Sequence, residues 1–327
     1  MIRPCAETTS TTQKQQSVLP SALLSSDEGS FLWREITRLP NYYQTRDEIS
    51  LLTTHGAEIA SLVPPNSILI DIGCGDTRKV EPLLTHLSTA LLESSPSSKV
   101  TYFGLDLSQP ALASSLSSLP PYPNIEVIGL WGTFTDGLSW LSSSTGTTIN
   151  PSRPKWFLSL GSILGNDFPA PAMKLLSSWA SIMRPGVDRM LLGMDGTTDP
   201  TIIWESYHDA ETASVFEKFM RLGLSHSNTI LGVEWYKPED WEVVGKMSTD
   251  YVMHQFVFRA LVDVNFRIPA GYHNVRFPRG HEIDCYEAFK FGPQDMVEQF
   301  RAVGLRQESI WKAPGDSCIC KFTLLTS

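Results

Sequence analysis

The 327-residue sequence has few cysteines, a modest number of basic residues and no long apolar run. Its five cysteines are an odd number scattered along the chain, which excludes a disulfide framework. Only Cys318 and Cys320 lie close together, and in a final strand they would share a face, which favours buried thiols over metal ligands. The seven histidines are dispersed without metal-ligand spacing, so no metal is predicted.

Positive charge is also in deficit, with 26 Lys and Arg against 35 Asp and Glu and a net charge of -9. Because a nucleic-acid protein needs clustered basic residues, and none are clustered here, nucleic acid is excluded as a partner. Charge or proline breaks every apolar run before the roughly 20 residues of a membrane helix, and no basic segment followed by an apolar one opens the chain. We expect a soluble, cytoplasmic protein with no membrane partner, as a monomer or weak homodimer.

The length allows one large or two modest domains, and the apolar pattern changes along the chain. Residues 1–20, rich in Ser, Thr and Gln, predict a disordered tail. Strand and helix patterns then alternate, which predicts an α/β fold with a parallel sheet, helices on both faces and ligands at the carboxyl ends of the strands. The expected strands are 68–72, 100–106, 124–130, 155–160 and 188–194, and the expected helices are 77–91, 109–118, 135–141 and 170–182.

After Asp195 the alternation stops. A helix over 200–223 and half-exposed antiparallel strands at 251–260 and 283–291 predict a second, smaller α+β domain. A helix at 294–303 and a strand at 317–325 then return to the first sheet. The predicted boundaries are 47–196 plus 290–327 for the sheet domain, and 21–46 plus 197–289 for a substrate-binding or lid domain.

The segment before the first expected strand predicts two helices. Apolar residues at helical spacing end at Pro40, and a second helix follows, for which Thr45 and Glu48 have capping-box spacing. Tyr42 and Tyr43 directly precede this second helix. Taken locally, the pattern favours both tyrosines as core aromatics.

The first expected strand runs into a glycine turn. It ends near Asp71, and Gly73 and Gly75 follow one residue apart, as a turn requires when bare backbone approaches a nucleotide. A dinucleotide fingerprint would place a third glycine where Arg78 stands, which weakens the hypothesis of an NAD-dependent oxidoreductase. S-adenosylmethionine is favoured instead, because the glycine turn and the helix start can bind its carboxylate and ribose. Asp106, at the end of the next strand, suits a ribose diol, with a helix cap as an equal alternative.

Five motifs follow one another in a specific order. They are EITRLPNYYQTR at 35–46, DIGCG at 71–75, GTFTDGL at 132–138, GSILGN at 161–166 and FKF at 289–291. Together they resemble the histidine-specific methyltransferases of ergothioneine biosynthesis and, more closely, their fungal relatives, the dimethylallyltryptophan N-methyltransferases of ergot-alkaloid pathways. The resemblance covers about residues 22–325. It implies a Rossmann-like class I S-adenosylmethionine-dependent methyltransferase sheet, an N-methyltransferase activity and a role in fungal secondary metabolism.

The resemblance also implies roles for the cofactor residues. Gly73, Lys79 and Asp106 match positions that bind S-adenosylmethionine, beside Asp71 and Gly75 of the turn. Thr133 and Phe134 match the pair on the adenine side, where the histidine enzymes usually carry an acid at the first position.

On the substrate side, the resemblance assigns three residues. Asn166 matches the residue that holds the substrate's α-amino group, and Tyr207 matches a tyrosine of the carboxylate site. Tyr43 matches the tyrosine beside the substrate ring. Asn166 and Tyr43 are therefore the candidate catalytic residues.

Departures from the histidine enzymes are informative about the substrate. Ser25 stands where they have a tyrosine near the head group. The imidazole-binding glutamate becomes Tyr286, its serine partner becomes Ala288 and a nearby methionine becomes Phe256. Because a site loses discrimination when a polar clamp is removed, tryptophan or a prenylated tryptophan is favoured over histidine as the amino-acid substrate.

The expected reaction is an in-line displacement, in which a neutral amine attacks the sulfonium methyl group and S-adenosylhomocysteine leaves. The enzyme's work is alignment and dehydration, with no obligatory general base. Two alternatives stay open on the sequence: a catalytically silent binding or regulatory protein, which the change at Ser25 allows, and an NAD-dependent oxidoreductase.

Overall fold

The computed structural model describes residues 17–143, 150–269 and 273–313, and the backbone alone of 318–324. The chain divides into two compact units. Residues 1–41 with 200–289 form unit 1, and residues 42–199 with 290–327 form unit 2. Residues 42–46 and 197–199 thus belong with the sheet of unit 2, whereas the sequence placed them in the smaller domain.

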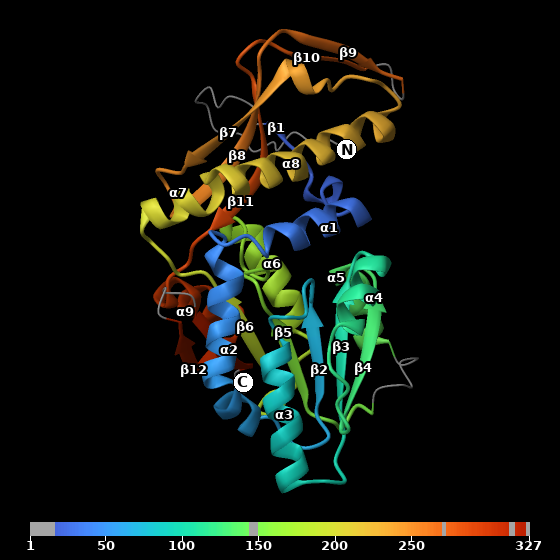
Figure 1. Ribbon diagram of the computed structural model, residues 1–327, viewed down its shortest axis with the longest axis vertical. Coiled ribbons are helices and arrows are strands. Elements are labelled where there is room, and N and C mark those ends of the chain that lie inside the picture. Colours follow the sequence, from blue (N-terminus) through green and yellow to red (C-terminus); the bar gives the residue numbers. More distant parts are fainter. Residues whose placement is uncertain (1–16, 144–149, 270–272, 314–317, 325–327) are drawn as a thin grey trace. The chain divides into compact units, whose positions relative to one another are not determined.

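Unit 2 is built on a seven-stranded sheet with the order β12-β13-β6-β5-β2-β3-β4 (Figure 1). The five strands from β6 to β4 are parallel, and β13 and β12 extend the β6 edge in antiparallel pairing. The strands are β2 (Ile68–Ile72), β3 (Val100–Asp106), β4 (Ile125–Trp131), β5 (Lys155–Ser159), β6 (Arg189–Met194), β12 (Leu305–Lys312) and β13 (Cys318–Leu324). This arrangement confirms the predicted Rossmann-like α/β fold.

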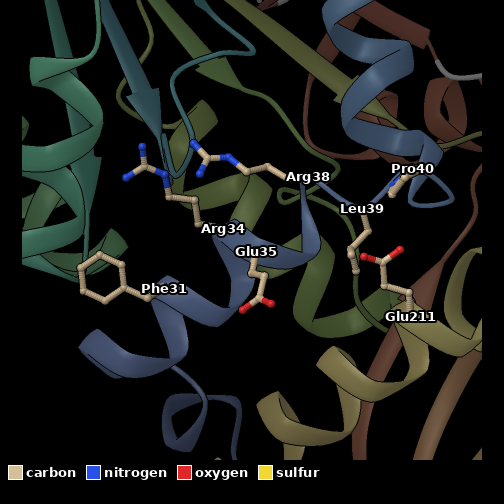
Figure 2. Close-up of a pocket in the computed structure, with 7 residues that line it drawn as sticks. All are labelled: Phe31, Arg34, Glu35, Arg38, Leu39, Pro40 and Glu211. Carbon is tan, nitrogen blue, oxygen red and sulfur yellow. The ribbon is translucent and has the colours of Figure 1, made fainter.

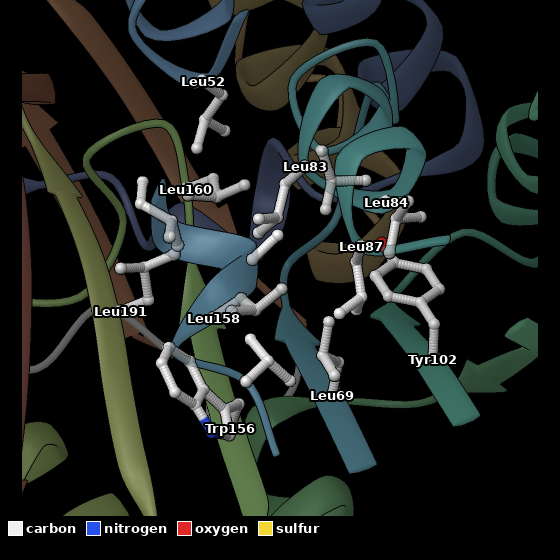
Figure 3. Close-up of a cluster of buried hydrophobic side chains, with 14 of the residues drawn as sticks. Leu52, Leu69, Leu83, Leu84, Leu87, Tyr102, Trp156, Leu158, Leu160 and Leu191 are labelled. Atoms are coloured by element: carbon white, nitrogen blue, oxygen red, sulfur yellow. The ribbon is translucent and has the colours of Figure 1, made fainter. Parts of the chain in front are cut away.

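Helices cover both faces of this sheet. They are α2 (Tyr43–Ser61), α3 (Glu81–Ser94), α4 (Gln109–Ser117), α5 (Phe134–Ser142), α6 (Pro169–Ala180) and α9 (Pro293–Ala302). Figure 3 shows the core on one face, where leucines of α2 and α3 meet Leu69, Tyr102 and Trp156 of three neighbouring strands. On the other face, the Phe157 ring packs edge-on against Trp179 of α6 at a centroid distance of 5.9 Å. Alternate residues of each strand therefore serve opposite faces, as burial on both sides requires.

Unit 1 combines helices with a four-stranded sheet of order β1-β11-β8-β7 and a β9–β10 hairpin. Its strands are β1 (Ser17–Val18), β7 (Trp241–Met247), β8 (Met253–Ala260), β9 (Val264–Ile268), β10 (His273–Phe277) and β11 (Glu282–Phe289). Its helices are α1 (Asp27–Ile36), α7 (Pro200–His208) and α8 (Ala210–Leu231), with 3-10 turns η1 (Ser21–Leu23) and η2 (Pro238–Asp240). No helix in the described ranges has both the length and the apolar composition that crossing a membrane needs.

Some of the differences from the sequence-based expectation lie at the start of the chain and in two helical segments. The end of the expected tail, Ser17–Val18, forms a strand that pairs in parallel with the edge of β11. Residues 1–16 lie outside the described part. The expected helix over 200–223 is two helices, since the Asp209 side chain accepts the Glu211 N–H and caps a new start. Helix α2 begins at Tyr43 without the Thr45–Glu48 capping box, and Glu48 is buried further along the helix.

Candidate active site

The glycine turn after β2 requires residues without a side chain. Gly73 and Gly75 have φ angles of 71° and 51°, in the left-handed region that favours glycine. A Cβ atom on Gly73 would lie 2.9 Å from Ile163 Cδ1 and 3.4 Å from the Phe134 ring. The Gly75 N–H donates to Asp106 Oδ2 at 2.9 Å. Asp106 therefore shapes the turn, in addition to standing at the end of β3.

Asp71 lies buried beneath this turn. The Tyr102 hydroxyl donates to its Oδ2 at 2.7 Å, while Oδ1 has no hydrogen-bond partner among the described residues. Burial raises the pKa of Asp71 to about 6, against the opposing effects of the Tyr102 bond and the Lys79 charge. A buried acceptor without a partner beside a bare glycine backbone suits a ligand that carries hydrogen-bond donors.

Lys79 and Glu48 are two further buried charged side chains of unit 2, and the charges of both act on Asp71. Lys79 Nζ donates to the Leu160 carbonyl at 3.1 Å, and Glu48 Oε1 accepts the Gly161 N–H at 2.9 Å. Glu48 Oε2 has no partner among the described residues, and burial raises the pKa of this carboxyl, with Lys79 opposing the shift. A Cβ on Gly193 would lie 1.9 Å from Glu48 Oε1, so this glycine makes room for the carboxyl.

The loop after β5 carries Asn166 in a constrained backbone. Gly161, Ser162 and Gly165 have φ angles of 86°, 57° and 86°. The half-buried Asn166 side chain donates through Nδ2 to the Ser162 carbonyl at 2.9 Å. This bond uses the amide nitrogen, whereas the role expected for Asn166 uses the amide oxygen.

Thr133 and Phe134 begin helix α5. Thr133 is the N-cap, and its hydroxyl both donates to Asp136 Oδ2 at 2.7 Å and accepts the Asp136 N–H at 3.1 Å. The Thr133 hydroxyl is thus engaged in capping the helix, while the Phe134 ring lies against Gly73. Of the adenine-side pair, only Phe134 is placed directly against the glycine turn.

A second buried polar cluster surrounds Asp195, just beyond β6. Its Oδ2 accepts from the Tyr43 hydroxyl at 2.6 Å, from Gln44 Nε2 at 2.7 Å and from Lys290 Nζ at 2.6 Å. The Asp195 and Lys290 side chains are each 1% exposed. Sequence reasoning missed this cluster, although Asp195 shows the same signal as Asp71 and Asp106, an apolar strand followed by an acid.

Unit 1 contains three of the aromatic residues assigned to the substrate, Tyr207, Phe256 and Tyr286, whereas Tyr43 belongs to unit 2. The fully buried Tyr207 ring stacks on His254, with centroids 4.3 Å apart, and lies edge-on to Phe256 at 6.0 Å. Tyr286 pairs with Phe256 across β11 and β8, and Ala288 pairs with His254. The centroid of the Phe216 ring lies 5.6 Å from that of Phe256 and 6.0 Å from that of Tyr286.

The sheet register also settles which face each β11 residue occupies. Tyr286 and Ala288 alternate with Glu287, which pairs with Gln255. Because side chains alternate between faces, Glu287 points to the face opposite Tyr286. A bulge between Asp284 and Tyr286 shifts the register before this stretch.

Unit 1 also contains a cavity of about 530 Å³ that none of the predicted site residues lines. Its lining is Phe31, Arg34, Glu35, Arg38, Leu39, Pro40 and Glu211. Figure 2 shows the guanidinium groups of Arg34 and Arg38 together, away from the Glu35 carboxylate. Ser25 lies outside this cavity lining, and its exposed hydroxyl donates to the Ser21 carbonyl.

Comparison with known sequences identifies the family. The family of histidine-specific, S-adenosylmethionine-dependent methyltransferases matches residues 6–324. The chain belongs to this family. Its cofactor is accordingly S-adenosylmethionine, and the NAD-dependent alternative no longer stands.

Individual relatives include enzymes named for histidine and enzymes named for 4-dimethylallyltryptophan. The histidine N-alpha-methyltransferase of Mycolicibacterium smegmatis is 31% identical over 90% of this chain and 87% of its own. The 4-dimethylallyltryptophan N-methyltransferase of Claviceps fusiformis is 32% identical over 91% of this chain and 85% of its own. Ergothioneine biosynthesis protein 1 of Neurospora crassa is 31% identical over 90% of this chain, which spans only 32% of that protein's length. These nearly equal identities do not separate the two substrate classes.

The residues of unit 2 fit the methyl donor of this family. S-adenosylmethionine carries an ammonium group and a ribose diol as donors, and Asp71 and Asp106 are acceptors beside the glycine turn. The described residues of this methyltransferase contain no cluster of three metal-ligating side chains. The Cys318 and Cys320 side chains lie outside the described part.

Proposed function

We propose that this methyltransferase acts on the α-amino group of an aromatic amino acid, with tryptophan or a prenylated tryptophan favoured over histidine. The observation that carries the proposal is the wall of unit 1 around Tyr286, where Phe256 and Phe216 are its neighbours. An imidazole N–H at this wall would not meet the Glu287 carboxylate, which lies on the other face of β11. A large, flat side chain suits such aromatic surroundings.

The proposed roles follow from the chemistry of each side chain. The cofactor supplies a sulfonium methyl group for transfer to nitrogen. The amide oxygen of Asn166 accepts a hydrogen bond from the substrate amine and orients its lone pair, Tyr207 positions the carboxylate, and Tyr43 contacts the ring. Asp71, Gly73, Gly75, Lys79, Asp106 and Phe134 are the proposed cofactor contacts, with Thr133 acting through the start of α5.

The deciding experiment is mass spectrometry of histidine, tryptophan, tyrosine and prenylated tryptophan, each incubated with the protein and S-adenosylmethionine. We expect tryptophan or its prenylated form to gain the mass of one methylene group per transfer. Preferential methylation of histidine would contradict the substrate assignment. A protein that binds the cofactor and methylates none of the four would instead support the silent-protein alternative.

Specificity can be tested at the same wall. The double variant Tyr286→Glu/Ala288→Ser restores the polar pair of the histidine enzymes, and we expect the ratio of histidine to tryptophan turnover to rise about tenfold or more. Glu287→Gln, on the opposite face of β11, is the matched control and should leave this ratio unchanged. An equal change in both variants would contradict a specificity role for Tyr286.

A further inference from the structure

The peptide that joins Leu160 to Gly161, just after β5, is held by a buried charged side chain at each end. Lys79 Nζ donates to the Leu160 carbonyl at 3.1 Å, and Glu48 Oε1 accepts the Gly161 N–H at 2.9 Å. Because the carbonyl meets a cation and the N–H meets an anion, both hydrogen bonds are charge-assisted and stronger than bonds between neutral groups. This peptide is therefore fixed from both sides.

Two glycines leave the room that these charged groups need. A Cβ atom on Gly161 would lie 2.5 Å from Lys79 Nζ, and a Cβ on Gly193 in β6 would lie 1.9 Å from Glu48 Oε1. Gly161 also has a φ of 86°, whereas the φ of Gly193 is not positive. Among the described residues, only Glu48 would crowd a methyl group at position 193, whose next neighbour, the Gly161 nitrogen, lies at an ordinary 3.6 Å.

The anchored peptide begins the loop that carries Asn166. Ser162, the residue after the anchored N–H, has a φ of 57°, which a residue with a side chain keeps only where its surroundings hold it. The Ser162 carbonyl accepts from Asn166 Nδ2 at 2.9 Å. A shift of the Gly161 N–H would be passed to this carbonyl, since it lies one residue further along the chain. The Glu48 bond is thus connected to the Asn166 amide through the backbone.

We propose that Glu48 is a positioning residue, which fixes loop 161–166 through the Gly161 N–H and so sets the orientation of the Asn166 amide toward the substrate amine. The inference rests on the proposed function, in which Asn166 holds that amine. In this role Glu48 acts through the backbone and touches no ligand. Lys79, a proposed cofactor contact, holds the other end of the same peptide, so the two binding sites share one peptide unit.

Gly193→Ala tests the proposal by displacing the Glu48 carboxyl without altering it. We expect KM to rise about tenfold, the effect of one lost charge-assisted hydrogen bond, for whichever of the four amino acids turns over best. The change in kcat should be smaller, and the Kd for S-adenosylmethionine should stay within about threefold, because the glycine turn is untouched. A general loss of stability would not separate KM from the cofactor Kd in this way.

Hydrogen exchange of the Gly161 amide is a second readout, which needs no turnover. In Gly193→Ala this amide should exchange about tenfold faster or more, because it loses its acceptor. Unchanged exchange would show that the carboxyl stays in place or that the bond does not protect the amide, and it would overturn the anchor.

Glu48→Ala completes a double-mutant cycle. Alone it should raise KM about tenfold, and Gly193→Ala in this background should cause little further change, because the added methyl enters the space that the carboxyl has left. Glu48→Gln keeps an acceptor and should hold KM within about threefold of the parent. A tenfold effect of Gly193→Ala in both backgrounds, or an unchanged KM for Glu48→Ala, would overturn the role of Glu48. A parent inactive on all four amino acids would overturn the proposed function itself.

Gly56→Ala is the matched structural control on the helix that carries Glu48. Gly56 is buried in α2, and a Cβ there would lie 2.6 Å from the His86 ring of α3. We expect this substitution to lower the thermal midpoint without changing KM or the exchange of the Gly161 amide. A KM increase equal to that of Gly193→Ala would show a merely structural effect and overturn the proposal.

Discussion

Three buried carboxyl groups, Asp71, Glu48 and Asp195, lie around the carboxyl ends of the parallel strands, and their surroundings differ. Asp195 is paired with the Lys290 ammonium, whereas Asp71 and Glu48 each keep one oxygen without a partner among the described residues. Unsatisfied buried acceptors destabilise a fold, and they persist where a ligand or a backbone geometry requires them. At the scale of single residues, Asp195 therefore stabilises the fold, whereas Asp71 and Glu48 each keep an acceptor that a ligand or the backbone geometry requires.

Asp71→Asn should stabilise the protein without ligand in a pH-dependent way. The folded pKa of Asp71 is raised from 3.8 to about 6, so its stabilising contribution is complete below pH 3.8 and is lost as the pH rises through 6. Relative to the parent, the variant should gain up to about 3 kcal/mol between pH 4 and pH 8, and it should bind S-adenosylmethionine more weakly. Thermal midpoints of both proteins across this range provide the measurement. A stability difference that does not vary with pH would contradict the assignment.

The role of Glu48 can be tested with two variants, one that keeps its hydrogen bond to the Gly161 N–H and one that removes it. Glu48→Gln keeps an acceptor for the Gly161 N–H, so we expect turnover within about threefold of the parent. Glu48→Ala removes this bond and leaves a cavity beside Gly193, which should lower stability by about 2 kcal/mol and kcat/KM about tenfold, because the Asn166 loop loses its anchor. Steady-state kinetics and thermal midpoints are compared with the exposed Glu58→Ala control on the same helix. Equal activity of the Gln and Ala variants would argue against the anchor.

At the scale of elements, two histidines meet at the end of α7. His208 Nε2 lies 2.9 Å from His254 Nε2, and the His208 ring stacks on Trp204 with centroids 3.8 Å apart. Burial lowers the pKa of His208. The Asp209 cap starts α8 directly after this pair, and the His254 ring stacks on Tyr207.

Gly245→Ala should disturb this arrangement. A Cβ at Gly245 in β7 would lie 2.1 Å from the His208 ring, too close for any real contact. We expect a loss of about 1–3 kcal/mol, read as a lower thermal midpoint, because the ring or the strand must shift. His208→Ala removes the overlapping ring, so Gly245→Ala should lower the stability less in the His208→Ala background than in the parent protein. Equal losses in both backgrounds would show that the His208 ring is not the obstacle.

At the scale of the whole molecule, binding of S-adenosylmethionine is coupled to the stability of unit 2. Saturation with S-adenosylmethionine at about 100 times its Kd should stabilise the fold by about 2.7 kcal/mol and raise the thermal midpoint. Gly73→Ala should abolish this shift, because the added methyl would meet Ile163 at 2.9 Å. Gly186→Ala is the matched control, since Gly186 has the same φ of 71° but open space around its Cβ position, and it should keep the shift. A ligand-induced shift in Gly73→Ala equal to that of the parent would contradict the cofactor site.

Much of the fold could be predicted from local pattern. The ranges expected for β2 and β3 match the structure, because both strands are continuous apolar runs closed by turn residues. Strands β7, β9, β10 and β12 were not predicted, since their half-exposed sequences carry weak periodicity. The capping signal at Thr45 and Glu48 failed because burial of Glu48 against Gly161 competes with a local cap.

The sequence by itself determined the parallel sheet and the glycine turn, because periodicity and short spacings are local properties of the chain, and its motifs carried the resemblance to the methyltransferase family. Only the tertiary structure decided which groups the buried charges meet. Asp195 finds Tyr43 and Lys290 across 152 and 95 residues, and Glu48 finds Gly161 across 113. No local pattern specifies such partners, since they depend on how separate strands and loops converge at one edge of the sheet.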